Sequence, residues 1–379
     1  MDYITSVSNW VLPFLILLTV LVFVHEMGHY LVARYCGVRV EVFSIGFGPE
    51  IYGWNGRDGT RWRFSVIPIG GYVKMFGEQP GGPGRDGEGP ELSAAERAES
   101  FAAKTLGQRA AIVFAGPFAN FLFAVVMLAG MFMAIGQPFT PADISSVEPN
   151  SAAERAGLKP GDVIASINGT KIERFEQVVG IVRMAPGQPL EITVQREGDE
   201  IVLDAVAGVH ERTDRFGNTQ SIGRLGVRRG TGDRVLVRYD PATAVWRASV
   251  ETVALSGQIL DFVWQMINGS RTSKELGGPI RIAQISSDMW QLGFASMIMF
   301  AVALSINLGL LNLFPVPMLD GGHLLFYLFE AIRGKPLGER AQEYGFRIGI
   351  VMVLGLMVFA TWNDLEYFHV FDFFVNLVT

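Results

Sequence analysis

The chain has 379 residues, of which 49% are hydrophobic and 18% are charged. This balance is too apolar for an ordinary soluble protein and predicts a membrane protein. The net charge of -6 and the absence of Lys/Arg-rich runs argue against nucleic acid as a partner. The single cysteine, Cys36, excludes an intramolecular disulfide, and we interpret it as a structural thiol.

Four apolar segments have about the 20 residues that a membrane-spanning helix needs. They are Trp10 to Ala33, Ala110 to Ile135, Phe294 to Phe314 and the shorter Phe346 to Trp362. We expect no cleavable signal peptide, because Met1 to Trp10 lacks a basic region and the first apolar run carries the chemistry described next.

Basic residues near the ends of the spans predict the orientation of the chain. Those that flank the first and third connections are Arg34, Arg39, Lys104, Arg109, Arg333, Lys335, Arg340 and Arg347. Both connections should therefore be cytoplasmic. Residues 1 to 9 and 363 to 379 contain no Lys or Arg, so both termini and the segment 136 to 293 should lie on the opposite side.

The first span contains the pattern HExxH, with histidines at positions 25 and 29. Two histidines four apart lie on one face of a helix and can bind one Zn²⁺. Glu26, beside the first histidine, then faces the open position of the metal and can take a proton from an attacking water. Ionisable groups inside a membrane helix are costly and usually functional, which favours this interpretation over a chance match. The site should lie close to the cytoplasmic face.

Alternating polar and apolar residues follow the first span and predict a β-hairpin, with a turn at Gly70 and Gly71. Such a sheet could receive an extended substrate as an added strand, or it could simply cover the membrane face. The loop 78 to 92 and an amphipathic helix from Ala94 to Ala103 lead to the second span. There Asn120 is expected to have a structural role between helices.

Residues 140 to about 230 change character, because charge rises and short strands alternate with a short helix. The run Lys159-Pro160-Gly161-Asp162 and the Asn168-Gly169 turn resemble a PDZ domain of the circularly permuted kind, and there is room for one such domain. Its candidate peptide-binding strand begins at Leu225, Gly226 and Val227. Peptide binding by strand addition and a steric filter both remain open. Residues 242 to 290 are expected to form amphipathic helices interrupted at Gly277-Gly278-Pro279.

The third span ends in Asn-Leu-Phe-Pro-Val-Pro-Met-Leu-Asp-Gly-Gly-His, from Asn312 to His323. Prolines 315 and 317 must break the helix and free backbone groups near Asp320. A catalytic zinc ion held by two histidines needs a third protein ligand, and Asp320 is the best-placed carboxylate. His323 is the competing ligand, and capping of a helix from Leu324 to Ile332 is the structural alternative for Asp320.

Together these motifs resemble the site-2 protease family of intramembrane zinc metalloproteases, and within it the bacterial regulator-of-sigma-E group. The resemblance implies Zn²⁺ as cofactor, His25, His29 and Asp320 as its ligands, and Glu26 as general base. It also implies that Asn307 and Asn312 contact the substrate. The residues of the hairpin that would clamp the substrate are Gly71, Tyr72, Val73, Lys74 and Met75.

The expected fold is a polytopic α-helical membrane protein with a cytoplasmic β-hairpin and an inserted periplasmic PDZ domain. The expected segments are residues 1–36 with the first span, 37–109 with the hairpin and loop, 110–136 with the second span, 137–235 with the PDZ domain, 236–292 with amphipathic helices, 293–345 with the third span and its connection, and 346–379 with the fourth span and tail.

The expected activity is hydrolysis of a peptide bond in or near the span of a substrate already trimmed on its outer side. Expected partners are membrane-spanning substrates of the anti-sigma-factor type, signal-peptide remnants and the lipid bilayer, at the bacterial inner membrane. The alternative function is a membrane-bound PDZ adaptor or chaperone with a structural metal site. A structural zinc site is closed by four protein ligands, whereas the sequence offers three and Glu26.

Overall fold

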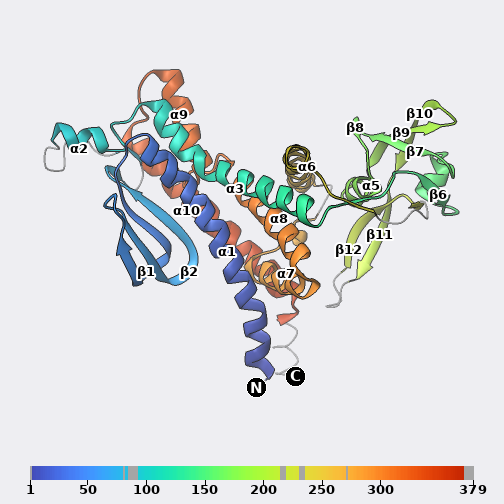
Figure 1. Cartoon of the computed structure of the whole chain (residues 1–379), viewed down its shortest axis with the longest axis horizontal. Coiled ribbons are helices and arrows are strands. Elements are labelled where there is room, and N and C mark those ends of the chain that lie inside the picture. Colours follow the sequence, from blue (N-terminus) through green and yellow to red (C-terminus); the bar gives the residue numbers. More distant parts are fainter. Residues whose placement is uncertain are drawn as a thin grey trace. The chain divides into compact units, whose positions relative to one another are not determined.

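A computed structural model describes residues 2–79, 82–83, 93–213, 219–229, 235–269 and 272–370 (Figure 1). The predicted tail from 371 and most of the predicted loop 78–92 lie outside these ranges. The helices are α1 Asp2–Tyr35, α2 Ala94–Glu99, α3 Leu106–Ala134, α4 Ala152–Arg155, α5 Phe175–Arg183, α6 Pro241–Ile267, α7 Pro279–Leu292, α8 Phe294–Leu313, α9 Asp320–Arg333 and α10 Glu339–Tyr367, with a 3-10 turn at Ser273–Glu275.

The strands are β1 Val40–Asn55, β2 Arg61–Met75, β3 Glu78–Gln79, β4 Gly82–Pro83, β5 Gln137–Phe139, β6 Ile144–Val147, β7 Val163–Ile167, β8 Thr170–Lys171, β9 Pro189–Arg196, β10 Asp199–Val206, β11 Gly208–Thr213, β12 Thr219–Arg224, β13 Val227–Arg229 and β14 Val235–Val237. The chain divides into two compact units. Unit 1 comprises residues 1–128, 248–256 and 276–364, and unit 2 comprises 129–247, 257–275 and 365–379.

Four of the described helices are long and apolar enough to cross a membrane, as predicted: Val11–Tyr35, Leu106–Ala134, Phe294–Leu313 and Arg340–Tyr367. The fourth is longer than its predicted apolar core, Phe346 to Trp362, because the helix continues through polar residues at both ends. The protein is therefore a polytopic membrane protein.

The predicted hairpin is present beside α1 (Figure 1). The first part of β1, Val40 to Ile45, pairs on one side with Arg61 to Phe64 and on the other with Gly71 to Met75. Gly71 to Met75 therefore forms an edge, because the described strands include no other partner for it. The prediction of a turn at Gly70 and Gly71 is wrong, because β2 runs through both glycines. The positive φ of Gly70, 94°, bends the strand instead.

The amphipathic helices α6 and α7 are interrupted at Gly277-Gly278-Pro279, as predicted. The carboxylate of Asp364, at the end of α10, is fully buried and accepts hydrogen bonds from the backbone N–H groups of Gly278, Ile280 and Arg281. These contacts satisfy the orphan donors of the first turn of α7. They tie α7 to α10 within unit 1.

Unit 2 is built around a four-stranded sheet in the order β10-β9-β7-β8. The Asn168-Gly169 turn between β7 and β8 has positive φ at both residues, 49° and 74°, as a tight hairpin turn requires. The core contains buried side chains from this sheet, from β6, α4 and α5, and Leu225 before β13. Asp162, directly before β7, is fully buried and accepts hydrogen bonds from Arg196 at 2.7 and 2.8 Å.

The bonded Arg196 guanidinium holds the pKa of the Asp162 carboxyl below its ordinary value. A group whose pKa is lowered by folding contributes stability above its unfolded pKa, about 3.9, and loses that contribution as the pH falls through the folded pKa. We predict that Asp162→Asn destabilises unit 2 at neutral pH by about 1–3 kcal/mol. The variant should also lose part of the acid-dependent destabilisation seen in the wild type.

Hydrogen exchange of unit 2 amides in the full-length protein, measured from neutral pH down to about pH 3, checks this prediction. Asp204→Asn, at an exposed position of β10, is the matched control and should leave both quantities unchanged. Equal protection in wild type and Asp162→Asn at neutral pH would contradict it.

Candidate metal centre and catalytic pocket

Three side chains from two helices converge in unit 1. His25 and His29 lie on one face of α1, and Asp320 is the first residue of α9. Their ligand atoms lie within 4.8 Å of one another, so the group could hold a metal ion. The two Nε2 atoms are 3.2 Å apart, and Oδ2 of Asp320 lies 3.2 Å from His25 Nε2 and 3.4 Å from His29 Nε2.

These separations fit a small tetrahedral cation. Bonds of about 2.0–2.1 Å to Zn²⁺ place neighbouring tetrahedral ligands about 3.3 Å apart. Oδ2 of Asp320 is buried and makes no hydrogen bond. Burial alone would raise the pKa of Asp320, but the neighbouring imidazoles lower it below its ordinary value, so the carboxylate is ionised. A buried, ionised oxygen without a hydrogen-bond donor is well suited to a metal cation.

Helix α3 orients both imidazoles. Nδ1 of His29 donates to the backbone oxygen of Ile112 at 2.8 Å, which leaves Nε2 with a lone pair directed at Asp320. The nitrogen of a neutral imidazole opposite a carbonyl must carry the proton, so this contact fixes the tautomer. Gly116 gives the rings their room, because a Cβ there would lie 2.2 Å from His29 Nε2 and 2.9 Å from His25 Cε1.

Asn120, which the sequence suggested only as a helix-packing residue, is in contact with the metal centre. The side-chain amide nitrogen of Asn120 lies 3.1 Å from Nδ1 of His25, and Asn120 is fully buried. The amide oxygen has no hydrogen-bond partner. Turned toward the ring, that oxygen accepts the Nδ1 proton and leaves Nε2 of His25 for a metal, as Ile112 does for His29. The presence of Asn120 as a polar residue in the apolar second span was the only sequence signal.

The broken third span delivers Asp320, as predicted. Helix α8 ends at Leu313 and α9 begins at Asp320, so the two prolines lie in the connection. The helix starts earlier than Leu324, and its N-cap is Leu319, with no side-chain cap. The capping alternative for Asp320 is therefore not what the structure shows. Met318, just before the carboxylate, has a φ of 94°, a strained value for a residue with a side chain.

A pocket of about 280 Å³ opens onto the metal centre. Glu26 lies in it with the three candidate ligands, as the HExxH spacing predicted. The backbone N–H of Val73, on the edge strand of β2, lies against the Glu26 carboxylate. The competing ligand His323 also lines the pocket but is not part of the ligand group among the described residues.

Some of the predicted substrate-binding residues line the pocket and others do not. Asn312 lines the pocket, and so do Tyr72, Val73 and Met75, whereas Asn307 is not among the lining residues. Gly71 lies against α1, because a Cβ there would be 3.4 Å from Cγ of Glu26. The Lys74 side chain does not line the pocket and forms an ion pair with Glu41 at 2.8 Å.

One contact that sequence reasoning missed ties α9 to α3. Arg109 at the start of α3 is buried and bonds the carboxylate of Glu330 on α9 at 2.6 Å. Its guanidinium also lies 5.0 Å from the ring centre of Tyr327, which lines the pocket. Nothing in the spacing of Arg109 and Glu330, 221 residues apart, indicated this pair. The pair holds the helix that carries Asp320 against the helix that orients the histidines.

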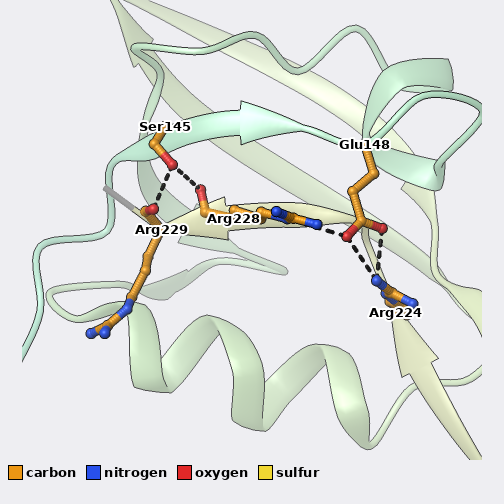
Figure 2. A network of polar contacts seen from close by, with 5 residues as sticks. All are labelled: Ser145, Glu148, Arg224, Arg228 and Arg229. Atoms are coloured by element: carbon orange, nitrogen blue, oxygen red, sulfur yellow. Dashed lines mark hydrogen bonds and ion pairs between the residues drawn. The ribbon is translucent and has the colours of Figure 1, made fainter. Parts of the chain in front are cut away.

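The candidate peptide-binding residues lie in unit 2, between Arg224 and Arg228 in the sequence. Leu225 is buried in the core of the unit, Gly226 has a φ of 82°, and Val227 opens β13. Glu148 binds Arg224 at 2.7 Å and forms an ion pair with Arg228 at 3.5 Å, so it links the two ends of this stretch (Figure 2). Because the Leu225 side chain faces the core, only the backbone of Leu225 could meet a peptide.

The crowding at Gly116 gives a testable prediction. Gly116→Ala should abolish binding of a divalent metal ion, because its Cβ would overlap both imidazoles. Gly130→Ala, on the same helix with open space around its Cβ, should bind the metal normally. Metal content of the two purified variants decides the matter. A full complement of metal in Gly116→Ala would contradict the close packing of α3 against the two imidazoles.

The contact between Asn120 and His25 gives a second testable prediction. Asn120→Leu should weaken metal binding by about 10–100-fold, because no acceptor then fixes the His25 tautomer. Asn120→Asp keeps an acceptor facing Nδ1. It should therefore bind the metal about 10–100-fold more tightly than Asn120→Leu does. Competition with a chelator measures both affinities. Equal affinities in the Leu and Asp variants would contradict the tautomer role.

Comparison with known proteins gives an independent line of support. Peptidase family M50 matches residues 13–356. A protein of Agrobacterium fabrum named as a candidate zinc metalloprotease is 46% identical, over 95% of this chain and 96% of its own. The Caulobacter vibrioides metalloprotease MmpA is 33% identical, over 96% of this chain and 97% of its own.

A solved PDZ domain from an SdrC-like protein of Listeria monocytogenes covers 24% of this chain and 90% of its own, at 16% identity and a TM-score of 0.19, which supports no fold assignment. The family match extends over most of the chain and includes both parts of the metal centre. The chain therefore belongs to peptidase family M50, the site-2 protease family, and is a membrane zinc metalloprotease.

Proposed function

We propose that this protease hydrolyses a peptide bond in or near the membrane span of a single-span protein that has already been trimmed on its outer side. The observation that carries the proposal is the position of Glu26. It shares one pocket with His25, His29 and Asp320, and it lies on an apolar helix directly against the edge strand Gly71 to Met75.

In this proposal His25, His29 and Asp320 hold the zinc ion, with imidazole tautomers set from α3. Zinc bound there supplies a Lewis acid that acidifies water and polarises a carbonyl. Glu26 accepts the proton of the attacking water and later delivers it to the amine leaving group. Three protein ligands leave a position open for reactants, which is typical of a catalytic site and disfavours the adaptor with a structural metal site.

Peptide bonds in a membrane helix are shielded by their own hydrogen bonds, so cleavage requires local unwinding. An unwound segment needs new backbone partners, because unsatisfied polar groups are costly in an apolar environment. The edge strand Gly71 to Met75 offers such partners by strand addition, and the amide of Asn312 lies in the same pocket. Asn307 would contact the substrate outside the pocket.

For the wider setting, the basic flanks of the spans support a bacterial inner-membrane protein with the hairpin and catalytic pocket near the cytoplasmic face. Unit 2, as a single PDZ domain, and both termini would then be periplasmic. There the domain screens substrates, either by binding a peptide at β13 or by excluding bulky outer domains. Anti-sigma factors and signal-peptide remnants are single-span substrates that fit these requirements.

The test uses purified full-length protein and a single-span reporter. Glu26→Gln should retain zinc and lose cleavage by about 10²–10⁴-fold, because a positioned base contributes roughly that factor. His25→Ala should lose both zinc and cleavage. Zinc content and fragment formation are measured side by side. Near-wild-type cleavage by Glu26→Gln would overturn the proposed mechanism, and a zinc-loaded wild type that leaves every single-span reporter intact would overturn the proposed substrate class.

A further inference from the structure

The free edge of Gly71 to Met75 presents backbone donors at every second residue. Phe76 N–H points inward and donates to the backbone oxygen of Arg39 at 2.8 Å. Since N–H groups alternate along a strand, those of Met75, Val73 and Gly71 point outward, away from β1. The outward direction is seen at Val73, whose N–H meets Glu26 on α1.

Two carboxylates occupy this edge. Oε2 of Glu78 accepts from the N–H of Met75 at 3.2 Å, and the Glu26 carboxylate lies against the N–H of Val73. Both carboxylates line the pocket of the metal centre. In the proposed mechanism Glu26 must accept the proton of the attacking water. An incoming substrate backbone can then take the place of Glu26 at Val73. The proposed chemistry has no such use for Glu78.

The turn that holds Glu78 is fixed by its surroundings. Phe76 is bonded on both sides, since its oxygen accepts from the N–H of Phe101 at 2.8 Å. Gly77 has a φ of 74°, and a Cβ there would overlap Oγ of the buried Ser100. Glu78 is thus returned toward Met75 by a turn with little freedom to move.

We propose that Glu78 is a specificity-determining residue that closes the Met75 end of the substrate-binding edge. An extended substrate then pairs with the outward groups of Val73 and Gly71 and cannot continue past them. The stop fixes which substrate bond lies opposite Glu26. This inference rests on the proposed function, in which the edge strand receives the substrate by strand addition.

The geometry predicts how the cleavage site moves when the stop is removed. Successive outward donors are about 6.6 Å apart, which is the rise of two residues. A shift by one residue would turn every substrate side chain to the opposite face, so the next accessible register differs by two. With the Met75 donor free, a second cut should appear two residues from the first.

The test compares fragments from a single-span reporter by mass spectrometry, using full-length zinc-loaded protein. Glu78→Ala, and Glu78→Ser as a second variant, should raise the ratio of the two-residue-shifted product to the original product by about fivefold, the value of one hydrogen bond of about 1 kcal/mol. Glu78→Gln is the matched control. Its amide oxygen still accepts from Met75, so its cleavage site should stay that of the wild type, whatever its rate.

An unchanged cleavage site in both Glu78→Ala and Glu78→Ser would overturn the inference, and so would loss of all cleavage in both variants with zinc retained. An equal shift in Glu78→Gln would also overturn it, because charge and not the hydrogen bond would then set the register. A wild type that cleaves no reporter, or a Glu26→Gln variant as active as the wild type, would overturn the proposed function and this inference with it.

Discussion

The structure depends on one constraint: polar metal ligands placed on apolar helices must find all their partners within the protein. His25 and His29 lie on a helix that is long and apolar enough to span a membrane, where bulk water cannot satisfy them. Helix α3 supplies what they need, through the backbone oxygen of Ile112 and the side chain of Asn120. The close approach that makes these contacts possible requires small residues, since a Cβ at Gly28 would lie 2.3 Å from the backbone oxygen of Ala115.

The third ligand comes from a different part of the chain and needs its own support. The connection before Asp320 is packed so tightly that a Cβ at Gly322 would lie 2.4 Å from the backbone oxygen of Val316. Helix α10 closes on the same connection, because a Cβ at Gly349 would overlap the backbone oxygen of Pro317. The buried pair of Arg109 and Glu330 then secures the far end of α9. Rigid support on both sides of a ligand holds it in the geometry that a metal requires.

In the proposed function, the edge strand of the hairpin links the metal centre to the substrate. Of the backbone donors that a substrate strand would use, that of Met75 bonds Glu78 and that of Val73 lies against Glu26. Binding of an extended substrate would therefore release Glu26 from Val73 at the moment when the general base is needed. Exchanging one hydrogen-bond partner for another costs little, because no donor is left unsatisfied in the pocket. If the substrate binds by strand addition, that binding and activation of the base are coupled through a single backbone group.

The sequence by itself determined the membrane class, the four spans, the pairing of His25 with His29, and the break that brings Asp320 to a helix start. These features are local, since apolar length, a four-residue spacing on a helix and the missing N–H of proline act within a few residues. Only the tertiary structure decided that Asn120 orients His25, that Arg109 binds Glu330, and that β2 runs through Gly70 and Gly71. Each of these depends on which helix or strand lies alongside, and residues far apart in the sequence carry no periodic signal of their contact. Asp320 illustrates both cases. Its position at a helix start is local, whereas its place in the candidate ligand group, which does not include His323, follows from how α9 packs.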